Sequence, residues 1–184
     1  MDKVRKALSE TALGSSIIHP DMNNSDLVGG IDPIESLTAG KLIHKSGVLD
    51  RQGWKILVMA DRLTRQSAAL IAQNIDTNPT GPYCIFDESE RTDENQLGAL
   101  NERMAFSFDL NDLRHNQFSV DIAPFEHFNT TLPTLSSDQQ TMIVAAAQQF
   151  GIYSMRPVEM VQRAAQFLCL LDARKEVSQD DIDT

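Results

Sequence analysis

Apolar runs and short alternating stretches mark four candidate strands along the chain. Residues 55–60, Lys-Ile-Leu-Val-Met-Ala, are apolar after the first position, as expected of a strand covered on both faces of a parallel sheet. Residues 16–19 and 82–86 form shorter apolar runs beside turn-forming residues, and residues 105–110 alternate between apolar and polar side chains. This pattern predicts a layered α/β fold with residues 55–60 at the centre of its sheet.

Helical spacing of apolar side chains fills the intervals between these runs. It predicts helices over residues 2–12, 34–39 and 61–75, and one or two helical turns within residues 97–104. Gly14 is a suitable stop for the first of these helices. Asp32 and Pro33 predict the start of the second helix, with Asp32 as its N-cap and Pro33 at its first position.

From Ser136 onward the pattern is helical only. The predicted helices cover residues 139–150, residues 158–171 and a segment that begins at residue 177. Ser137 and Asp138 offer caps for the first helix, Gly151 ends it, and Pro157 opens the second. We therefore expect a boundary within residues 125–135. It separates an α/β core over residues 1–128 from a helical domain over residues 136–184.

Composition and charge narrow the classes of function. The 184 residues are 41% apolar and 23% charged, which is ordinary for a globular protein. No apolar run approaches the roughly 20 residues of a membrane helix, and no secretory signal follows the basic start, so a cytoplasmic location is predicted. The formal charge of −10 argues against a nucleic-acid partner. Cys84 and Cys169 lie among apolar residues and predict free thiols, and the scattered histidines predict no metal site.

Several local motifs follow one another in a family-specific order. They are Ser-Asp-Leu-Val-Gly-Gly-Ile-Asp-Pro-Ile-Glu at 25–35, Gly-Lys at 40–41, Ser-Gly-Val-Leu at 46–49, Leu-Val-Met-Ala-Asp-Arg-Leu at 57–63, Leu-Asn-Glu-Arg-Met-Ala-Phe at 100–106, and Val-Ser-Gln-Asp-Asp-Ile at 177–182. In this order they resemble the I and D subunits of magnesium chelatase, and above all the AAA+ portion of the D subunit. The resemblance implies a P-loop-type α/β core with a parallel sheet, followed by a C-terminal helical lid.

The resemblance also assigns positions to individual residues. At the end of the Walker B strand, an active ATPase carries adjacent Asp and Glu residues that hold Mg²⁺ and orient the attacking water. This chain has Ala60 and Asp61 there, and alanine cannot organise a metal ion. Glu88 falls at sensor 1, where a carboxylate would repel a γ-phosphate. Arg103 matches the arginine finger that reaches a neighbouring subunit's nucleotide, and Arg163 matches sensor 2.

A phosphate-binding loop is not found among the motifs. The chain contains no Gly-x-x-x-x-Gly-Lys-Ser/Thr segment. By the resemblance, the helix predicted over residues 2–12 corresponds to the helix that follows a P-loop. The P-loop and the first, central strand of the sheet are therefore expected to precede residue 1. The resemblance covers nearly all of this chain but only part of the D subunit.

Each assigned residue also has a plainer interpretation. Arg103 can be a surface or capping arginine, and Arg163 can lie on a solvated helix face. Asp61 can cap the helix that it precedes, which Ala60 makes the favoured role. Glu88 can belong to a solvated acidic loop that binds nothing.

These features together predict a non-hydrolysing AAA+ platform subunit of magnesium chelatase. It would join the ATPase I subunit in a homo-oligomeric or mixed ring, and the H subunit indirectly, for ATP-dependent insertion of Mg²⁺ into protoporphyrin IX in chlorophyll or bacteriochlorophyll synthesis. ATP and Mg²⁺ would be bound mainly by the partner, with no cofactor tightly bound to this chain, and whether the chain is itself an enzyme stays open. The alternatives are a related chaperone-like AAA+ ATPase, which needs a P-loop and paired Walker B acids, and a free-standing interaction module derived from an AAA+ domain.

Overall fold

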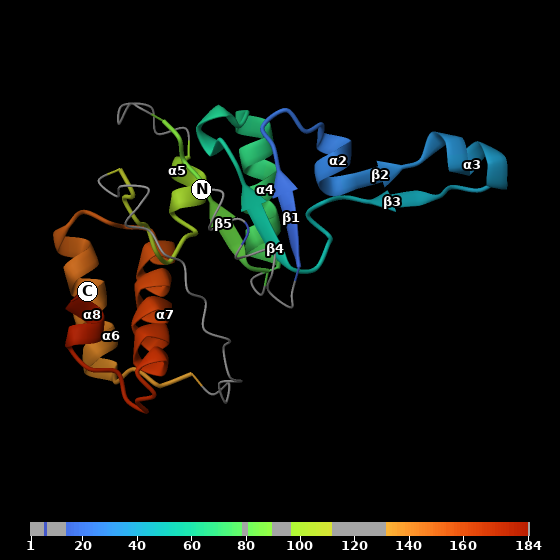
Figure 1. Ribbon diagram of the computed structural model, residues 1–184. Helices are drawn as coiled ribbons and strands as arrows, with labels where there is room; N and C mark the ends of the chain where they lie inside the picture. The colour runs from blue at the N-terminus through green and yellow to red at the C-terminus, as the bar shows by residue number, and fades with distance from the viewer. Residues whose placement is uncertain (1–5, 7–13, 79–80, 90–96, 112–131, 184) are drawn as a thin grey trace. The chain divides into compact units, whose positions relative to one another are not determined.

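The computed structural model describes residues 6, 14–78, 81–89, 97–111 and 132–183. It divides into two compact units, Met1–Asn101 and Glu102–Thr184 (Figure 1). The helix predicted over residues 2–12 lies outside the described residues, apart from Lys6. The domain boundary predicted between residues 128 and 136 falls partly on residues outside the described ranges and stays a prediction.

A parallel sheet forms the centre of the first unit. Its strands are β1 (Ser15–Ile18), β4 (Trp54–Leu57) and β5 (Tyr83–Ile85), in the order β1-β4-β5. The register pairs Ile17 with Ile56 across β1 and β4, and Ile56 with Cys84 across β4 and β5. Ile56 and Leu57 are fully buried. The α/β fold with β4 as the middle strand is thereby confirmed.

The helices of this unit are α2 (Asn24–Val28), α4 (Arg65–Thr77) and α5 (Gly98–Asn101), together with the tip helix α3 described below. The prediction that the main helix starts at Asp61 and is capped by it is wrong. Ala60–Arg62 form a separate 3-10 turn, η1, and Leu63 then returns to an extended backbone. The helix therefore restarts at Thr64, whose side chain accepts a hydrogen bond from the Ser67 backbone N–H at 3.1 Å.

An arm, defined as residues 29–46, extends from the first unit as a two-stranded ribbon with a helix at its tip (Figure 1). It comprises β2 (Gly29–Ile31), α3 (Pro33–Ala39) and β3 (His44–Ser46), with the two strands antiparallel. The predicted N-cap is confirmed, because the Asp32 carboxylate accepts hydrogen bonds from the Ile34 and Glu35 amides. The strands of the arm are not predicted by the sequence pattern.

The second unit is built from α6 (Ser137–Gln149), α7 (Met155–Leu171) and α8 (Asp180–Asp183). Its buried core contains Ala165, Cys169 and Val177. Ser136 caps α6 in a reciprocal capping box with Gln139, one residue before the predicted caps. The helix α7 begins ahead of Pro157, at Met155, with Ser154 as its cap.

The strand predicted over residues 105–110 is wrong. These residues form no regular secondary structure. Alternation places Phe106 and Phe108 on one side of the segment, where they stack on each other with ring centroids 6.2 Å apart, and Phe106 also meets Phe167 of α7 edge-on at 6.0 Å. The alternating pattern therefore serves an aromatic contact instead of a sheet.

Two further predictions concern the thiols and the membrane. Cys84 is half-buried, Cys169 is buried, and both are free, as predicted. Burial raises the pKa of both thiols above the usual cysteine value. In the described part of the chain, no helix has both the length and the apolar character needed to cross a membrane.

Candidate functional site

The carboxyl ends of β4 and β5 form the edge of the sheet at which α/β proteins bind ligands. The two chain segments that leave these strands are joined by backbone hydrogen bonds. Phe86 N–H donates to the Leu57 carbonyl at 2.9 Å, and Ala60 N–H donates to the Phe86 carbonyl at 3.0 Å. Residues that follow the two strands are therefore held side by side at this edge.

Asp61 and Glu88, two of the predicted site residues, meet here. The Glu88 backbone N–H donates to Asp61 Oδ1 at 3.4 Å, and Arg62 Nε lies 3.8 Å from Asp61 Oδ2. The Asp61 side chain is only 21% exposed. Asp61 therefore tethers the segment after β5, a role that the sequence alone did not indicate.

The backbone of Met59, which follows β4, adopts a left-handed conformation. Met59 has φ 49° and ψ 47°, a conformation that few residues other than glycine adopt. It ends the extended segment after β4 and turns Ala60 inward. Unusual backbone of this kind is often found at functional sites, and here it coincides with the position that the resemblance marks as Walker B.

Ala60 belongs to the hydrophobic core. Its exposure is 0%, and it clusters with Ile18, Leu57 and Leu63. Its methyl group offers no ligand to a cation, and Asp61, the next residue, is engaged by the Glu88 backbone N–H. The described residues at this edge therefore do not fit a Mg²⁺–nucleotide complex. Within the described ranges, no three His, Cys, Asp or Glu side chains are grouped to hold a metal ion.

Arg103 and Arg163, the other predicted site residues, both belong to the second unit. Arg103 is half-buried in the turn that follows α5, whose Leu100 is fully buried. Arg163 is exposed on α7 and donates to Glu159 Oε1, one helical turn earlier, at 2.6 Å. Such exposed pairs stabilise a helix little. Arg163 thus lies on a solvated face, and the finger and sensor roles of the two arginines stay predictions.

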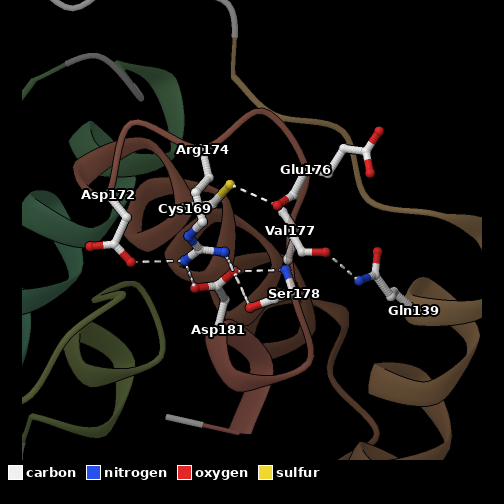
Figure 2. Close-up of polar contacts among 8 residues, drawn as sticks. All are labelled: Gln139, Cys169, Asp172, Arg174, Glu176, Val177, Ser178 and Asp181. Atoms are coloured by element: carbon white, nitrogen blue, oxygen red, sulfur yellow. Dashed lines mark hydrogen bonds and ion pairs between the residues drawn. The ribbon is translucent and has the colours of Figure 1, made fainter.

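A half-buried ion pair joins Arg174, in the loop after α7, to the buried Asp181 of α8 in the second unit (Figure 2). Arg174 Nη1 donates to Asp181 Oδ2 at 2.7 Å, Nη2 donates to Oδ1, and Nη2 also reaches Asp172 Oδ2 at 2.9 Å. The Ser178 backbone N–H and hydroxyl donate to Asp181 Oδ2 at 2.7 and 2.9 Å. Hydrogen bonds from Arg174, and then from Ser178, hold the pKa of Asp181 well below its usual range despite burial.

Sequence reasoning missed Arg174, although the pattern Ser178-x-x-Asp181 is a recognisable capping signal. Two contacts extend the network along the same loop. Gln139 Nε2 of α6 donates to the Val177 carbonyl at 2.8 Å, and Cys169 Sγ donates to the Glu176 carbonyl at 3.1 Å (Figure 2). The loop between α7 and α8 is therefore fixed to both long helices.

Comparison with known proteins agrees with this architecture. Residues 140–184 match the family described as the AAA lid domain. The chain is 31% identical over 172 residues to the magnesium-chelatase 60 kDa subunit of Rhodobacter capsulatus, covering 89% of this chain and 30% of that protein. It is 26% identical over 186 residues to the subunit of the same name from Cereibacter sphaeroides, covering 98% of this chain and 33% of that protein. The chain thus spans about a third of the length of these relatives.

A solved structure supports the fold. A crystal structure from Cytophaga hutchinsonii, described as a candidate ATPase, superposes with a TM-score of 0.66 at 14% identity and covers 98% of this chain and 69% of its own. At this identity the likeness concerns the fold alone. The chain is therefore an α/β protein with a C-terminal AAA lid domain, related over most of its length to magnesium-chelatase 60 kDa subunits.

Proposed function

We propose that this chain acts as a non-hydrolysing AAA+ platform subunit of a cytoplasmic magnesium chelatase. It assembles with an ATP-hydrolysing I-type subunit in a mixed or homo-oligomeric ring, and it contacts the porphyrin-holding H-type subunit indirectly. The observation that carries the proposal is the sheet edge itself, where Ala60 is enclosed in the core and Asp61 is engaged by the Glu88 amide. The relation to 60 kDa chelatase subunits supports the assembly role.

The chemistry of phosphoryl transfer supports the absence of hydrolysis. That reaction depends on positioning and on neutralising the charge of the phosphates. An edge that has an alanine in place of the metal-organising acid, and a carboxylate at Glu88 that would repel a γ-phosphate, does the opposite. In this proposal, ATP and its Mg²⁺ are bound mainly by the I-type subunit, and the Mg²⁺ inserted into protoporphyrin IX is a substrate of the complex.

Arg103 gives the platform a part in its neighbour's reaction. A guanidinium group is always charged and can stabilise the charge that develops on transferred phosphate. In the proposal, Arg103 acts in trans on the nucleotide of the adjacent I-type subunit. Arg163 of the lid has the sensor 2 role and exchanges its surface partner Glu159 for nucleotide when the ring assembles.

The test measures ATP hydrolysis and assembly separately. Arg103→Ala should lower ATPase turnover of the mixed complex toward that of the I-type subunit alone, while size-exclusion chromatography shows normal assembly. Arg51→Ala is the matched control, because Arg51 is an exposed arginine that lies outside the candidate site. Unchanged turnover at full occupancy would refute the finger role. Hydrolysis by this chain alone would refute the platform proposal, and failure to bind an I-type subunit under ATP would favour a free-standing interaction module.

A further inference from the structure

Arg103 lies where the chain passes from the first unit to the second. The first unit ends at Asn101, the last residue of α5, and the second begins at Glu102. Within the described range 97–111, the residues that follow α5 form no helix or strand. The hydrogen bonds of regular secondary structure therefore do not fix the position of Arg103, and other contacts of this segment must do so.

An anchor in the first unit lies three residues before Arg103. Leu100 of α5 is fully buried and belongs to the core cluster of that unit, together with Leu97. The backbone N–H groups of Leu100 and Asn101 both donate to the Leu97 carbonyl at 2.8 Å. Displacing Leu100 would expose apolar surface to water. This end of the segment is therefore fixed to the first unit.

A second anchor lies three residues after Arg103. The Phe106 ring meets the Phe167 ring of α7 edge-on, with centroids 6.0 Å apart and ring planes inclined by 60°. Aromatic pairs prefer this geometry, because the positive edge of one ring faces the negative face of the other. Phe106 is 42% exposed, whereas Phe108, which stacks on Phe106, is 77% exposed. Phe106 is therefore the ring that attaches the segment to the second unit.

Phe167 is a well-held point on the lid helix α7. Ala165 and Cys169, two residues to either side of it, are buried in the core of the second unit. Arg163 precedes Phe167 by one helical turn, so both side chains lie on the same face of the helix. The ring that contacts Phe106 is therefore joined through one turn of helix to the residue predicted as sensor 2.

We propose that Phe106 is a positioning residue that makes the placement of Arg103 depend on the lid. Leu100 ties Arg103 to the core at one end, and the contact between Phe106 and Phe167 ties it to α7 at the other. A change in the orientation of the lid moves the second anchor and shifts Arg103 with it. This inference rests on the proposed function, because it concerns how the finger role of Arg103 is regulated.

The spacing of the anchors sets the size of the effect. Three residues of extended chain span about 10 Å, so a segment held at one end alone leaves Arg103 a wide range of positions. A displacement of about 1 Å can lower the rate of an enzymatic reaction about 100-fold. Loss of the second anchor should therefore lower turnover strongly. It should leave the binding of ATP to the partner unchanged, because a finger acts on the transferred phosphate.

The experiment measures steady-state ATP hydrolysis by the mixed complex with an I-type subunit. Phe106→Ala should lower kcat at least about tenfold with KM for ATP unchanged. Phe167→Ala should cause the same loss, whereas Phe106→Tyr keeps the ring and should retain turnover. Phe150→Ala is the control, since Phe150 is 81% exposed at the end of α6, and it should leave turnover unchanged.

Double variants separate positioning from a general loss of structure. In an Arg103→Ala background, Phe106→Ala should cause no further loss, because the ring acts through the arginine. The losses caused by Phe106→Ala and Phe167→Ala should likewise not add to each other. Additive losses in either pair, or a loss in Phe150→Ala equal to that in Phe106→Ala, would overturn the proposal.

Fluorescence of this chain alone tests the anchor without a partner. Phe106→Trp in a Trp54→Phe background places the single tryptophan against Phe167. Adding Phe167→Ala should lower the anisotropy of that tryptophan, and adding Phe150→Ala should not. Unchanged anisotropy in the Phe167→Ala variant would show that the ring contact does not hold the segment, and the proposal would be wrong.

The two proposals fail in different ways. If Arg103→Ala lowers turnover and Phe106→Ala does not, the positioning role is wrong and the finger role stands. If Arg103→Ala leaves turnover unchanged, the finger role is wrong and the positioning role falls with it.

Discussion

Ala60→Asp places a carboxylate at the position that the resemblance aligns with Walker B, and it tests whether this position is a core site or a functional one. Ala60 is fully buried, and its cluster partners Ile18, Leu57 and Leu63 are aliphatic. Its backbone N–H is already bonded to the Phe86 carbonyl. We expect the substitution to destabilise the first unit without creating ATPase activity.

The size of the effect follows from volume and polarity. Adding atoms to a packed core costs about 1–3 kcal/mol, and burying a polar group without a partner costs about another 1–3 kcal/mol. The total, roughly 2–6 kcal/mol, is a large part of the 5–15 kcal/mol that stabilises a typical domain. Burial raises the pKa of the introduced carboxyl above its unfolded value of about 3.9. The native state therefore keeps a proton that the unfolded state has lost, and the penalty should grow as pH rises above about 4.

The assay is urea unfolding followed by the fluorescence of Trp54, the single tryptophan, which lies half-buried in β4. Measurements at neutral pH and near pH 4 should show a larger loss at neutral pH. Ala69→Asp is the control on the exposed face of α4 and should cost less than about 1 kcal/mol. If Ala60→Asp costs no more than this control, or if its penalty is independent of pH, then Ala60 faces water and our interpretation of the site is wrong.

Three further predictions concern other parts of the molecule. Arg174 and Ser178 hold the pKa of Asp181 well below its usual range, so the free energy of unfolding of the second unit should be highest at neutral pH and should decrease below about pH 4. Asp181→Asn should weaken this acid dependence, measured by helical circular dichroism. Asp32→Ala should cost about 1 kcal/mol, confined to the arm, and should speed hydrogen exchange of the Ile34 amide without changing the unfolding midpoint of the core. Burial raises the pKa of Tyr83 to about 12, so absorbance titration should show a late tyrosine ionisation that is absent in Tyr83→Phe.

The regular elements of the core could largely be predicted from local pattern. The runs at 16–19, 55–60 and 82–86 became β1, β4 and β5, and the middle strand β4 is buried after its first residue, as its continuous apolar run predicts. The helices α4, α6 and α7 follow from helical spacing, with errors of a few residues at their starts. Asp32 and Pro33 located the start of α3 correctly.

The sequence-based predictions failed for elements in which burial leaves no periodic pattern of apolar residues. The strands β2 and β3 have three residues each and are mostly exposed, so no apolar alternation marks them. Asp61 was expected to cap a helix, but Leu63 returns to an extended backbone and gives that role to Thr64. The positions of these strands and of this helix cap depend on contacts between residues that are distant in the sequence.

The sequence by itself determined the class of fold and the helical character of the lid. Each depends on residue types within one segment, and local periodicity reports them. Only the tertiary structure decided that the Ala60 methyl is enclosed, that Asp61 meets the Glu88 amide 27 residues away, and that Ile34, Leu37 and Leu42 of the arm are exposed. These facts depend on which segments meet after the sheet has formed, and the pattern within a single segment does not contain that information.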